Sequence, residues 1–254
     1  MSLGIVIPSY RPDIGLLSAY IDSLSDRLAP SEILVELDAP QSDETVTTLR
    51  QKPVILHVSS DRRGKGAAIT HGFDSLDTDI RMFLDADGST MARSAADIYE
   101  SVRDGEAEIC VGSRRQPSAE IVNHQTVTRR YMGDLFAWAA RQMLPIALQD
   151  YQCGAKAVTS QAWHDIRTHL YESGFAWDLE LVAIADAMGY EVAETPVQWE
   201  DQPGSTVELP DAVVEFSRAL LAVRHRSLAI EGDRIHRSLP ASNSPPLVAG
   251  MDQD

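Results

Sequence analysis

The stretch "RMFLDADGST", residues 81–90, decides how this chain is interpreted. Three apolar residues lead directly into Asp85 and Asp87, which are separated by one alanine and followed by Gly88. Alternate residues of a strand point to the same side, and a glycine just beyond it lets the chain turn. The pattern therefore predicts two carboxylates that converge where a buried strand ends.

The segments on either side alternate between strand-like and helix-like patterns. Short apolar runs predict strands, whereas apolar residues spaced three and four apart predict helices. Regular alternation of the two is typical of βαβ units, and hence of an α/β fold with a mainly parallel sheet. We predict strands at residues 3–8, 32–37, 54–59, 80–85 and 107–113, and helices at 13–28, 43–51, 64–76 and 94–102, the last capped by Ser94.

The regular alternation of predicted strands and helices ends after residue 115. The patterns predict a long, mostly apolar helix at 126–148, a short strand at 155–160, helices at 160–170 and 176–188, a strand at 191–199 and a final helix at 211–230. The Pro- and Ser-rich ending predicts a disordered tail. We expect one domain over residues 1–237, with a nucleotide-binding half (1–115) and an acceptor half (116–237), followed by the tail at 238–254.

Composition agrees with a single folded domain. Of 254 residues, 44% are hydrophobic, which suits one large α/β domain. No apolar run approaches the ~20 residues needed to span a bilayer, and no signal peptide is recognised, so we expect a cytoplasmic protein. Cys110 and Cys153 are too few for a disulfide framework and are expected to be buried thiols.

The formal net charge is -16, which repels nucleic acid and argues against nucleic-acid binding. Lysine occurs only at positions 52, 65 and 156, while arginine is common. An acidic, lysine-poor surface indicates adaptation to a salty cytoplasm, where high ionic strength screens self-repulsion. Lys65 and Lys156 both fall inside glycine-containing motifs, which makes them candidates for a functional role.

Several residues at predicted strand ends could contact a ligand. Asp85 and Asp87 could hold Mg²⁺ or Mn²⁺ beside a phosphate, or could simply form a turn or a helix cap. "RRGKGAAITHGF" (62–73) opens a helix on glycines and adds Lys65, which favours anion binding, although its spacing is not that of a P-loop. Tyr10 could stack on a base, and Asp38 could accept from a base or ribose; a core-edge tyrosine and a turn aspartate are the alternatives.

These positions together resemble a known family. "VIPSY", "ELDAP", "GKGAA" and "FLDADGST" occur in the order and spacing of family 2 glycosyltransferases, which have the nucleotide-sugar-binding GT-A fold. "VGSRR" (111–115), "DYQCGAKAVT" (150–159), "FAWDLEL" (175–181) and "VQWEDQPGST" (197–206) are similar to the dolichyl-phosphate glucosyltransferase and mannosyltransferase branch. The resemblance covers roughly residues 3–226.

The resemblance implies a role for each matched residue. We expect the nucleoside pocket to be lined by Pro8, Tyr10 and Asp38, and the nucleotide to be faced by Lys65 and Asp85. Asp87 is expected to bind the metal with Asp85, and Arg114 to reach phosphate.

The later motifs imply roles near the sugar and the diphosphate. Gln152, Cys153 and Gly154 are expected to lie near the donor sugar. Asp178 is expected to act as catalytic acid/base or sugar-binding residue, with Glu180 on the same helix. Trp199 and Ser205 are expected to belong to a loop that closes over the diphosphate.

The chain departs from the family pattern in two motifs. Leu37 precedes a single Asp38 where the second strand usually ends in two adjacent aspartates, and Thr206 stands where the closing loop often has a basic residue. Diphosphate contacts are then expected to fall to Arg114, Arg129 or Arg130.

The implied activity is inverting transfer of a hexose from a nucleotide diphosphate sugar, of UDP-glucose or GDP-mannose type. Arg129 and Arg130 open an apolar helix, which favours a polyprenyl phosphate acceptor such as dolichyl phosphate, for protein or surface glycosylation. A saccharide hydroxyl acceptor and a non-catalytic sugar-nucleotide-binding scaffold are the alternatives.

The C-terminal segment is rich in arginine, with Arg218, Arg224, Arg226, Arg234 and Arg237. These arginines could give peripheral contact with a membrane or could form ion pairs with neighbouring acids.

Overall fold

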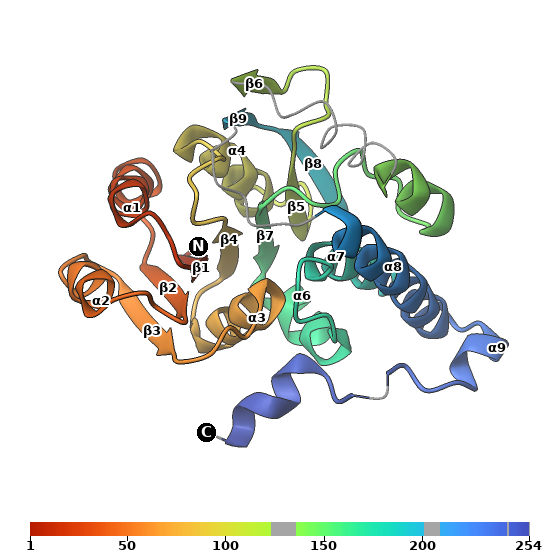
Figure 1. Ribbon diagram of the computed structural model, residues 1–254. Helices are drawn as coiled ribbons and strands as arrows, with labels where there is room; N and C mark the ends of the chain where they lie inside the picture. The colour runs from red at the N-terminus through yellow and green to blue at the C-terminus, as the bar shows by residue number, and fades with distance from the viewer. Residues whose placement is uncertain (123–135, 201–208, 243, 254) are drawn as a thin grey trace.

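The computed structural model describes residues 1–122, 136–200, 209–242 and 244–253. Its centre is a seven-stranded sheet with helices on both faces (Figure 1). The strands are β1 (Leu3–Tyr10), β2 (Glu32–Asp38), β3 (Ile55–Ser59), β4 (Ile80–Leu84), β5 (Ile109–Ser113), β7 (Ala155–Thr159) and β8 (Val192–Pro196). They lie side by side in the order β3-β2-β1-β4-β7-β5-β8.

The sheet is mainly parallel, which confirms the predicted α/β class. Strands β1 to β4 pair in parallel, as do β5 and β8, whereas β7 is antiparallel to both β4 and β5. Because β7 is inserted between two strands of the N-terminal half, the two expected halves share one sheet. The start of β7 therefore meets the end of β4, with Leu84 opposite Ala155.

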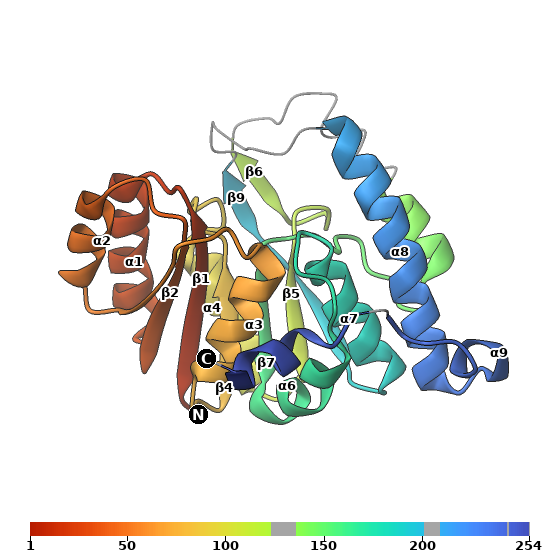
Figure 2. The same cartoon turned by 60° about the horizontal axis from the view of Figure 1, so that its bottom comes forward.

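Two apolar layers hold helices against the sheet (Figure 2). Successive strand residues alternate between the layers: Ile5 and Ile7 face the first layer, and Val6 faces the second. Phe73 and Trp163 meet edge to face at 5.0 Å in the second layer. The first layer packs α1 (Ile14–Leu28), α2 (Asp43–Arg50) and α4 (Ala92–Arg103), and the second packs α3 (Lys65–Ser75), α6 (Ser160–Ile166) and α7 (Trp177–Ala187).

The predicted cap at Ser94 is wrong. Helix α4 begins two residues earlier, with Met91 as its cap residue. The Ser94 hydroxyl instead accepts a hydrogen bond of 2.8 Å from the Gln198 amide. This backbone donor lies where the chain leaves the main sheet, and the serine satisfies it.

The predicted strand at 191–199 is divided in the structure. Its second part is β9 (Gln198–Glu200), which leaves the main sheet and pairs in parallel with β6 (Glu120–Val122). The predicted helix at 126–148 is also shorter where it is described, because residues 136–143 are helical and 144–148 are not. Pro145 explains this end, since a proline disfavours helical backbone in the residue before it. Residues 126–135 lie outside the described chain.

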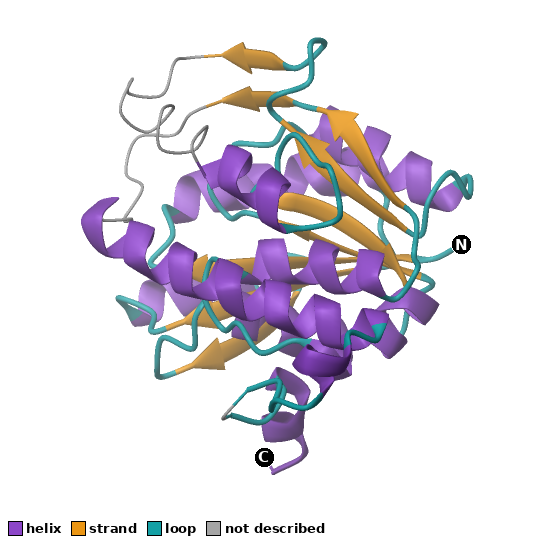
Figure 3. Cartoon of the chain, turned by 90° about the vertical axis from the view of Figure 1, so that its right-hand side faces the viewer, coloured by secondary structure: helices purple, strands orange, loops and turns teal. Residues whose placement is uncertain are grey.

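The C-terminal region is more ordered than the predicted tail. Helix α8 (Leu209–Glu231) packs on α7, and α9 (Arg234–Arg237) follows it. A short 3-10 helix, Leu247–Gln253, then returns to the body of the protein, where the Leu247 amide donates to the Leu170 carbonyl at 2.8 Å. Leu247 packs against the second apolar layer, which accounts for the order. Figure 3 shows this segment and the β6–β9 pair at opposite ends of the molecule.

Within the described residues, every helix is too short or too polar to cross a bilayer.

Candidate active site

The carboxyl ends of the parallel strands bring several predicted residues to one edge of the sheet. Tyr10 ends β1 directly opposite Asp38, which ends β2. Asp85 follows β4, and its amide donates to the Gly154 carbonyl at 2.9 Å just before β7 begins. Ligands of open α/β sheets bind beyond these strand ends, so the geometry places the candidate site here.

A network of two lysines and two aspartates forms the floor of the site. Lys65 Nζ lies 2.9 Å from Asp85 Oδ1 and 2.9 Å from Asp178 Oδ2. Lys156 Nζ lies 2.6 Å from Asp178 Oδ1 and donates to the Cys153 carbonyl at 2.9 Å. The four side chains come from α3, α7, β7 and the turn after β4, so the network joins elements that are distant in sequence.

Burial and opposite charges set the ionisation of this network. Burial alone would raise the pKa of Asp178, but Lys156 and Lys65 outweigh it and hold that pKa below its usual range. Burial alone would lower the pKa of Lys65, but Asp178 and Asp85 raise it instead. Asp178 is therefore an anion and Lys65 a cation at neutral pH. Lys156 also stands 5.5 Å from the Phe83 ring centre, within reach of a cation–π interaction.

The turn after β4 could hold a divalent cation. Desolvation raises the pKa of Asp85, and the charges of Asp87 and Asp178 raise it further, whereas Lys65 lowers it. The pKa of Tyr20 is also raised, first by burial and then by Asp87 and Asp85, so both carboxylates act on one phenol. A cation between these hard oxygen donors would relieve the repulsion, and Mg²⁺ and Mn²⁺ match that chemistry.

Gly154 permits the close approach of β7 to this turn. A Cβ atom at residue 154 would lie 1.8 Å from Asp85 Oδ2, so only glycine fits beside the carboxylate. Gln152 and Cys153 precede it, and the Cys153 side chain is buried as the sequence predicts. Burial raises the pKa of the Cys153 thiol to about 12, so it remains protonated at neutral pH.

The expected nucleoside pocket lies around β1 and β2. Asp38 Oδ2 accepts from the Arg63 amide at 2.7 Å, and its Oδ1 accepts from Arg63 Nε at 2.8 Å. Arg62 lies 4.2 Å from the centre of the Tyr10 ring. Pro8 is opposite Glu36 in the same pair of strands. Asp38 thus orders the segment that precedes α3, and a base that stacked on the Tyr10 ring would share it with the Arg62 guanidinium.

Arg114, which is expected to reach phosphate, forms a two-point ion pair with Asp150 in this structure. Its Nε lies 2.7 Å from Asp150 Oδ2 and its second terminal nitrogen donates to Asp150 Oδ1 at 2.9 Å. Burial opposes ionisation of Asp150, but the Arg114 guanidinium outweighs it and lowers the pKa of Asp150. Arg114 therefore serves first as an ion-pair partner at the edge of the site.

Trp199 does not belong to a loop. It is a mostly buried residue of β9, bridged to Thr90, and its ring centre lies 5.5 Å from the Arg114 guanidinium. Pairing with β6 accounts for this placement, which the sequence pattern of a single long strand does not reveal. Ser205, Arg129 and Arg130 lie outside the described residues.

Glu180 is held away from the lysine–aspartate network. Its Oε2 accepts from the Tyr171 and Glu172 amides, both at 2.8 Å, and its Oε1 lies 3.1 Å from Arg226 Nε. Burial raises the pKa of Glu180 to about 7 in spite of these partners. The residue joins α7 to α8 through its ion pair with Arg226.

Three contributors to the site were not assigned a role from sequence: Lys156, Asp150 and Arg63. Lys156 had a usable signal, because a lysine inside an apolar strand of a lysine-poor chain requires a buried partner. Asp150 and Arg63 had no comparable signal, since their partners lie 36 and 25 residues away.

A mainly parallel α/β sheet thus carries an acidic turn and two ion-paired lysines at its strand ends, where open α/β sheets bind their ligands. Comparison with known proteins agrees. Residues 4–162, more than half of the chain, match the family described as Glycosyl transferase family 2, and the chain belongs to that family.

Curated relatives extend the similarity beyond the matched region. Glycosyltransferase AglD of Haloferax volcanii is 33% identical over 165 residues, which is 64% of this chain but only 26% of that protein. Dolichyl-phosphate beta-glucosyltransferase of Saccharomyces cerevisiae is 23% identical over 250 residues, covering 87% of this chain and 74% of the relative. Undecaprenyl-phosphate mannosyltransferase of Micrococcus luteus is 27% identical over 241 residues, covering 88% and 96%.

Solved structures show the same fold. Mannosyl-3-phosphoglycerate synthase from Rubrobacter xylanophilus superposes with a TM-score of 0.68 at 15% identity, covering 97% of this chain and 79% of that one. Glucosyl-3-phosphoglycerate synthase from Mycobacterium tuberculosis, solved with Mn²⁺, UDP-glucose and phosphoglyceric acid, gives 0.67 at 16% identity, covering 98% and 91%.

Proposed function

We propose that this chain is an inverting hexosyltransferase that uses a nucleotide diphosphate sugar, of UDP-glucose or GDP-mannose type, and a polyprenyl phosphate acceptor. The family and the fold support glycosyl transfer, and the names of the yeast and Micrococcus relatives indicate a lipid phosphate. The product would be a lipid-linked hexose for protein or surface glycosylation.

The choice of a phosphate acceptor depends on the ionisation state of Asp178. Its carboxylate is buried between two lysines, which lower its pKa and make it a weak base. A saccharide hydroxyl must lose a proton as it attacks, and a weak base helps little. A phosphate is already an anion at neutral pH, so it needs positioning rather than deprotonation.

On the donor side, the ion pairs with Asp178 and Asp85 keep Lys65 charged and fix it at the strand ends. When the anomeric bond breaks, negative charge develops on the leaving nucleoside diphosphate, and a fixed cation beside it stabilises the transition state. Asp87 and Asp85 would hold Mg²⁺ or Mn²⁺, which supplies further charge neutralisation when bound. Attack from the opposite face inverts the anomeric centre.

Exposed apolar side chains on two helices that pack together could contact the lipid. Trp138, on the helical segment 136–143, is 57% exposed, and Leu221 on α8 is also exposed. The ring centres of Phe136 and Phe216 lie 4.9 Å apart, which joins the two helices. We propose that these exposed side chains make peripheral contact with the membrane that contains the acceptor.

The C-terminal arginines contribute less to such contact than their number suggests. Arg226 is buried against Glu172, and Arg224 donates to the Met143 carbonyl. Arg237 donates to the Ala229 carbonyl at 3.3 Å. Three of the five basic side chains are therefore engaged within the protein, which favours the ion-pair and packing alternative for them.

A matched pair of acceptors tests the proposal. Purified chain is incubated with labelled UDP-glucose or GDP-mannose, Mg²⁺ or Mn²⁺, and either polyprenyl phosphate or the corresponding polyprenol. We expect transfer to the phosphate and none to the alcohol, with inverted configuration by NMR. Transfer to a saccharide or to phosphoglycerate, but not to polyprenyl phosphate, would overturn the acceptor assignment. No transfer at all, with Asp87→Ala binding nucleotide as well as the parent, would favour a scaffold.

The acidic composition supports a further proposal about the working environment. We propose that the protein functions in a salty cytoplasm, because a net charge of -16 is tolerated best where ions screen it. The salt dependence of thermal stability tests this proposal.

A further inference from the structure

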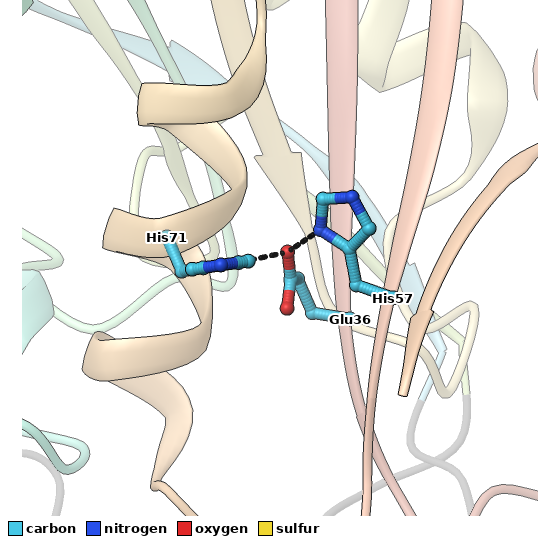
Figure 4. Close-up of side chains that lie close together, drawn as sticks. All are labelled: Glu36, His57 and His71. Atoms are coloured by element: carbon cyan, nitrogen blue, oxygen red, sulfur yellow. Dashed lines mark hydrogen bonds and ion pairs between the residues drawn. The ribbon is translucent and has the colours of Figure 1, made fainter. Parts of the chain in front are cut away.

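A second cluster of side chains with metal-ligand chemistry lies apart from the Asp85–Asp87 turn. Glu36 on β2, His57 on β3 and His71 on α3 converge so that one ligand atom of each lies within 4.8 Å of the others (Figure 4). His57 Nδ1 and His71 Nδ1 are both 2.8 Å from the same oxygen, Glu36 Oε1. We refer to these three residues as the histidine cluster.

Regular structure positions all three side chains. Glu36 and His57 are direct partners in the β2–β3 register, so they lie side by side on one face of the sheet. Helix α3 comes close to that face at Gly72, where a Cβ would lie 2.6 Å from Val6 Cγ1. This close packing brings His71, the preceding residue, within reach of Glu36. Sites built on strands and helices hold their ligands more accurately than sites on loops.

The three side chains of the histidine cluster differ in their exposure to solvent. The Glu36 side chain is 0% exposed, whereas those of His57 and His71 are 32% and 38% exposed. A cation arriving from solvent would therefore meet the two imidazoles first and the carboxylate behind them. The half-open side leaves room for water as a further ligand.

Arg63 orients the carboxylate from behind. It donates to the other oxygen, Glu36 Oε2, at 2.7 Å, which leaves Oε1 directed at the two histidines. A metal-binding carboxylate is commonly fixed by such a partner on its second oxygen. Arg63 also binds Asp38, so the cluster is linked to the expected nucleoside pocket.

We propose that Glu36, His57 and His71 form a site for a borderline-soft divalent cation of the Zn²⁺ class. Two imidazole nitrogens and one carboxylate oxygen match Zn²⁺ and disfavour Mg²⁺, which prefers oxygen ligands alone. The site is separate from the Asp85–Asp87 turn and does not depend on the proposed reaction. Bound metal would tie β2, β3 and α3 together beside Arg63.

Metal binding must displace protons from this cluster. A carboxylate oxygen only accepts hydrogen bonds, so each Nδ1 facing Oε1 carries a proton in the metal-free protein. On binding, that proton leaves for solvent from a charged imidazole, or moves to Nε2 in a neutral one, and the freed lone pair coordinates the cation. Binding is therefore accompanied by proton release wherever a histidine is charged.

Calorimetric titration with Zn²⁺ in excess Mg²⁺ tests the proposal on the full chain. The Mg²⁺ keeps the acidic turn supplied with its own cation. We expect one Zn²⁺ per chain, with a heat that varies with the ionisation enthalpy of the buffer because protons are released. His57→Gln and His71→Gln should each weaken binding by at least the ~10–100-fold that loss of an outer-shell partner costs, since each removes one of three protein ligands. Both variants should keep the circular dichroism spectrum of the parent, because the two rings are partly exposed.

Matched controls separate this site from others. His225 and His236 form a second histidine pair, with Nδ1 atoms 2.7 Å apart, so His225→Gln reports any binding there. Asp87→Ala reports binding at the acidic turn. Both controls should bind Zn²⁺ like the parent.

Unchanged Zn²⁺ affinity in His57→Gln and His71→Gln, or an equal loss in His225→Gln, would overturn the proposal. Absence of Zn²⁺ binding by the parent would show that the cluster is only a hydrogen-bonded counter-ion for Glu36. The visible spectrum of Co²⁺ offers an independent measurement, because the intensity and position of its bands distinguish nitrogen from all-oxygen ligation.

Discussion

Lys156 shows how one residue controls the chemistry of its neighbour. It is almost fully buried, and its ammonium group is matched by Asp178 at 2.6 Å. A buried charge without a partner is strongly destabilising, so the two residues must be considered together. Lys156 and Lys65 keep Asp178 ionised, and this restricts the roles that Asp178 can have.

Substitution of Asp178 tests this coupling. Asp178→Asn leaves Lys65 and Lys156 short of a counter-ion and should lower the free energy of unfolding by about 3–5 kcal/mol. Lys156→Met should be destabilising by a similar amount, yet the double variant should lose less than the sum of the two. Chemical denaturation of the four proteins measures the cycle. Additive effects would show that the pair is not coupled.

His71 gives a pH-dependent prediction. Its pKa is raised above 6.5, first by the hydrogen bond to Glu36, with burial opposing, Arg63 lowering it and Asp74 adding to the rise. The folded state therefore binds this proton more tightly than the unfolded state. The resulting stability is complete below the unfolded pKa and is lost as pH rises through the folded pKa.

We therefore expect the parent to exceed His71→Gln in stability at acidic pH, and the difference to shrink as pH rises above neutrality. Denaturant titrations with a chelator present exclude any metal contribution. His164→Gln, at an exposed position, serves as the control. A difference that is constant with pH would contradict the prediction.

At the scale of elements, the antiparallel strand β7 shapes the site. It brings Gly154 against Asp85 and Lys156 beside Phe83. Parallel βαβ units alone would leave β5 next to β4 and would not supply either residue. The reversed strand thus adds a lysine and a close backbone contact to the ligand-binding edge.

Gly154→Ala should damage the site more than the fold. The added Cβ would lie 1.8 Å from Asp85 Oδ2, and the carboxylate must shift. We expect overpacking to cost about 1–3 kcal/mol of stability and cation-dependent nucleotide binding to weaken by at least about 10-fold. Calorimetry with nucleoside diphosphate and Mn²⁺ measures the effect. Gly250→Ala is the control, since nothing lies within 4 Å of its added Cβ; equal binding by both variants would contradict the prediction.

Local sequence patterns predicted most elements well, and their failures have physical causes. The strand at 80–85 and the helix at 64–76 agree with β4 and α3 to within one residue at each end, because apolar spacing and glycines act locally. Ser94 was misassigned as a cap because its true partner, the Gln198 amide, is 104 residues away. The division of β8 from β9 depends on pairing with β6, which the strand's own residues do not encode.

At the scale of the whole molecule, charge balance governs the response to salt. Acidic residues outnumber lysine and arginine by 38 to 22, so the folded chain repels itself at low ionic strength. At 1 M salt the Debye length falls to about 3 Å, which screens the repulsion between surface carboxylates.

We expect the thermal unfolding temperature to rise steadily as KCl increases to molar concentration. Scanning calorimetry measures this, with a neutral osmolyte at matched osmolality as the control. The buried Lys156–Asp178 and Arg114–Asp150 pairs should be little affected, because buried pairs are screened much less than exposed ones. A transition temperature that falls or stays constant with KCl would contradict the proposed adaptation to salt.

The sequence by itself determined the α/β class, the acidic turn at Asp85 and Asp87, the glycine-led helix with Lys65 and the family resemblance, because these depend on neighbouring residues and fixed strand and helix periods. Only the tertiary structure decided which charges meet. The Lys156–Asp178 pair, the Arg114–Asp150 pair and the histidine cluster of Glu36, His57 and His71 arise from strand register and helix packing, which bring distant residues within bonding distance.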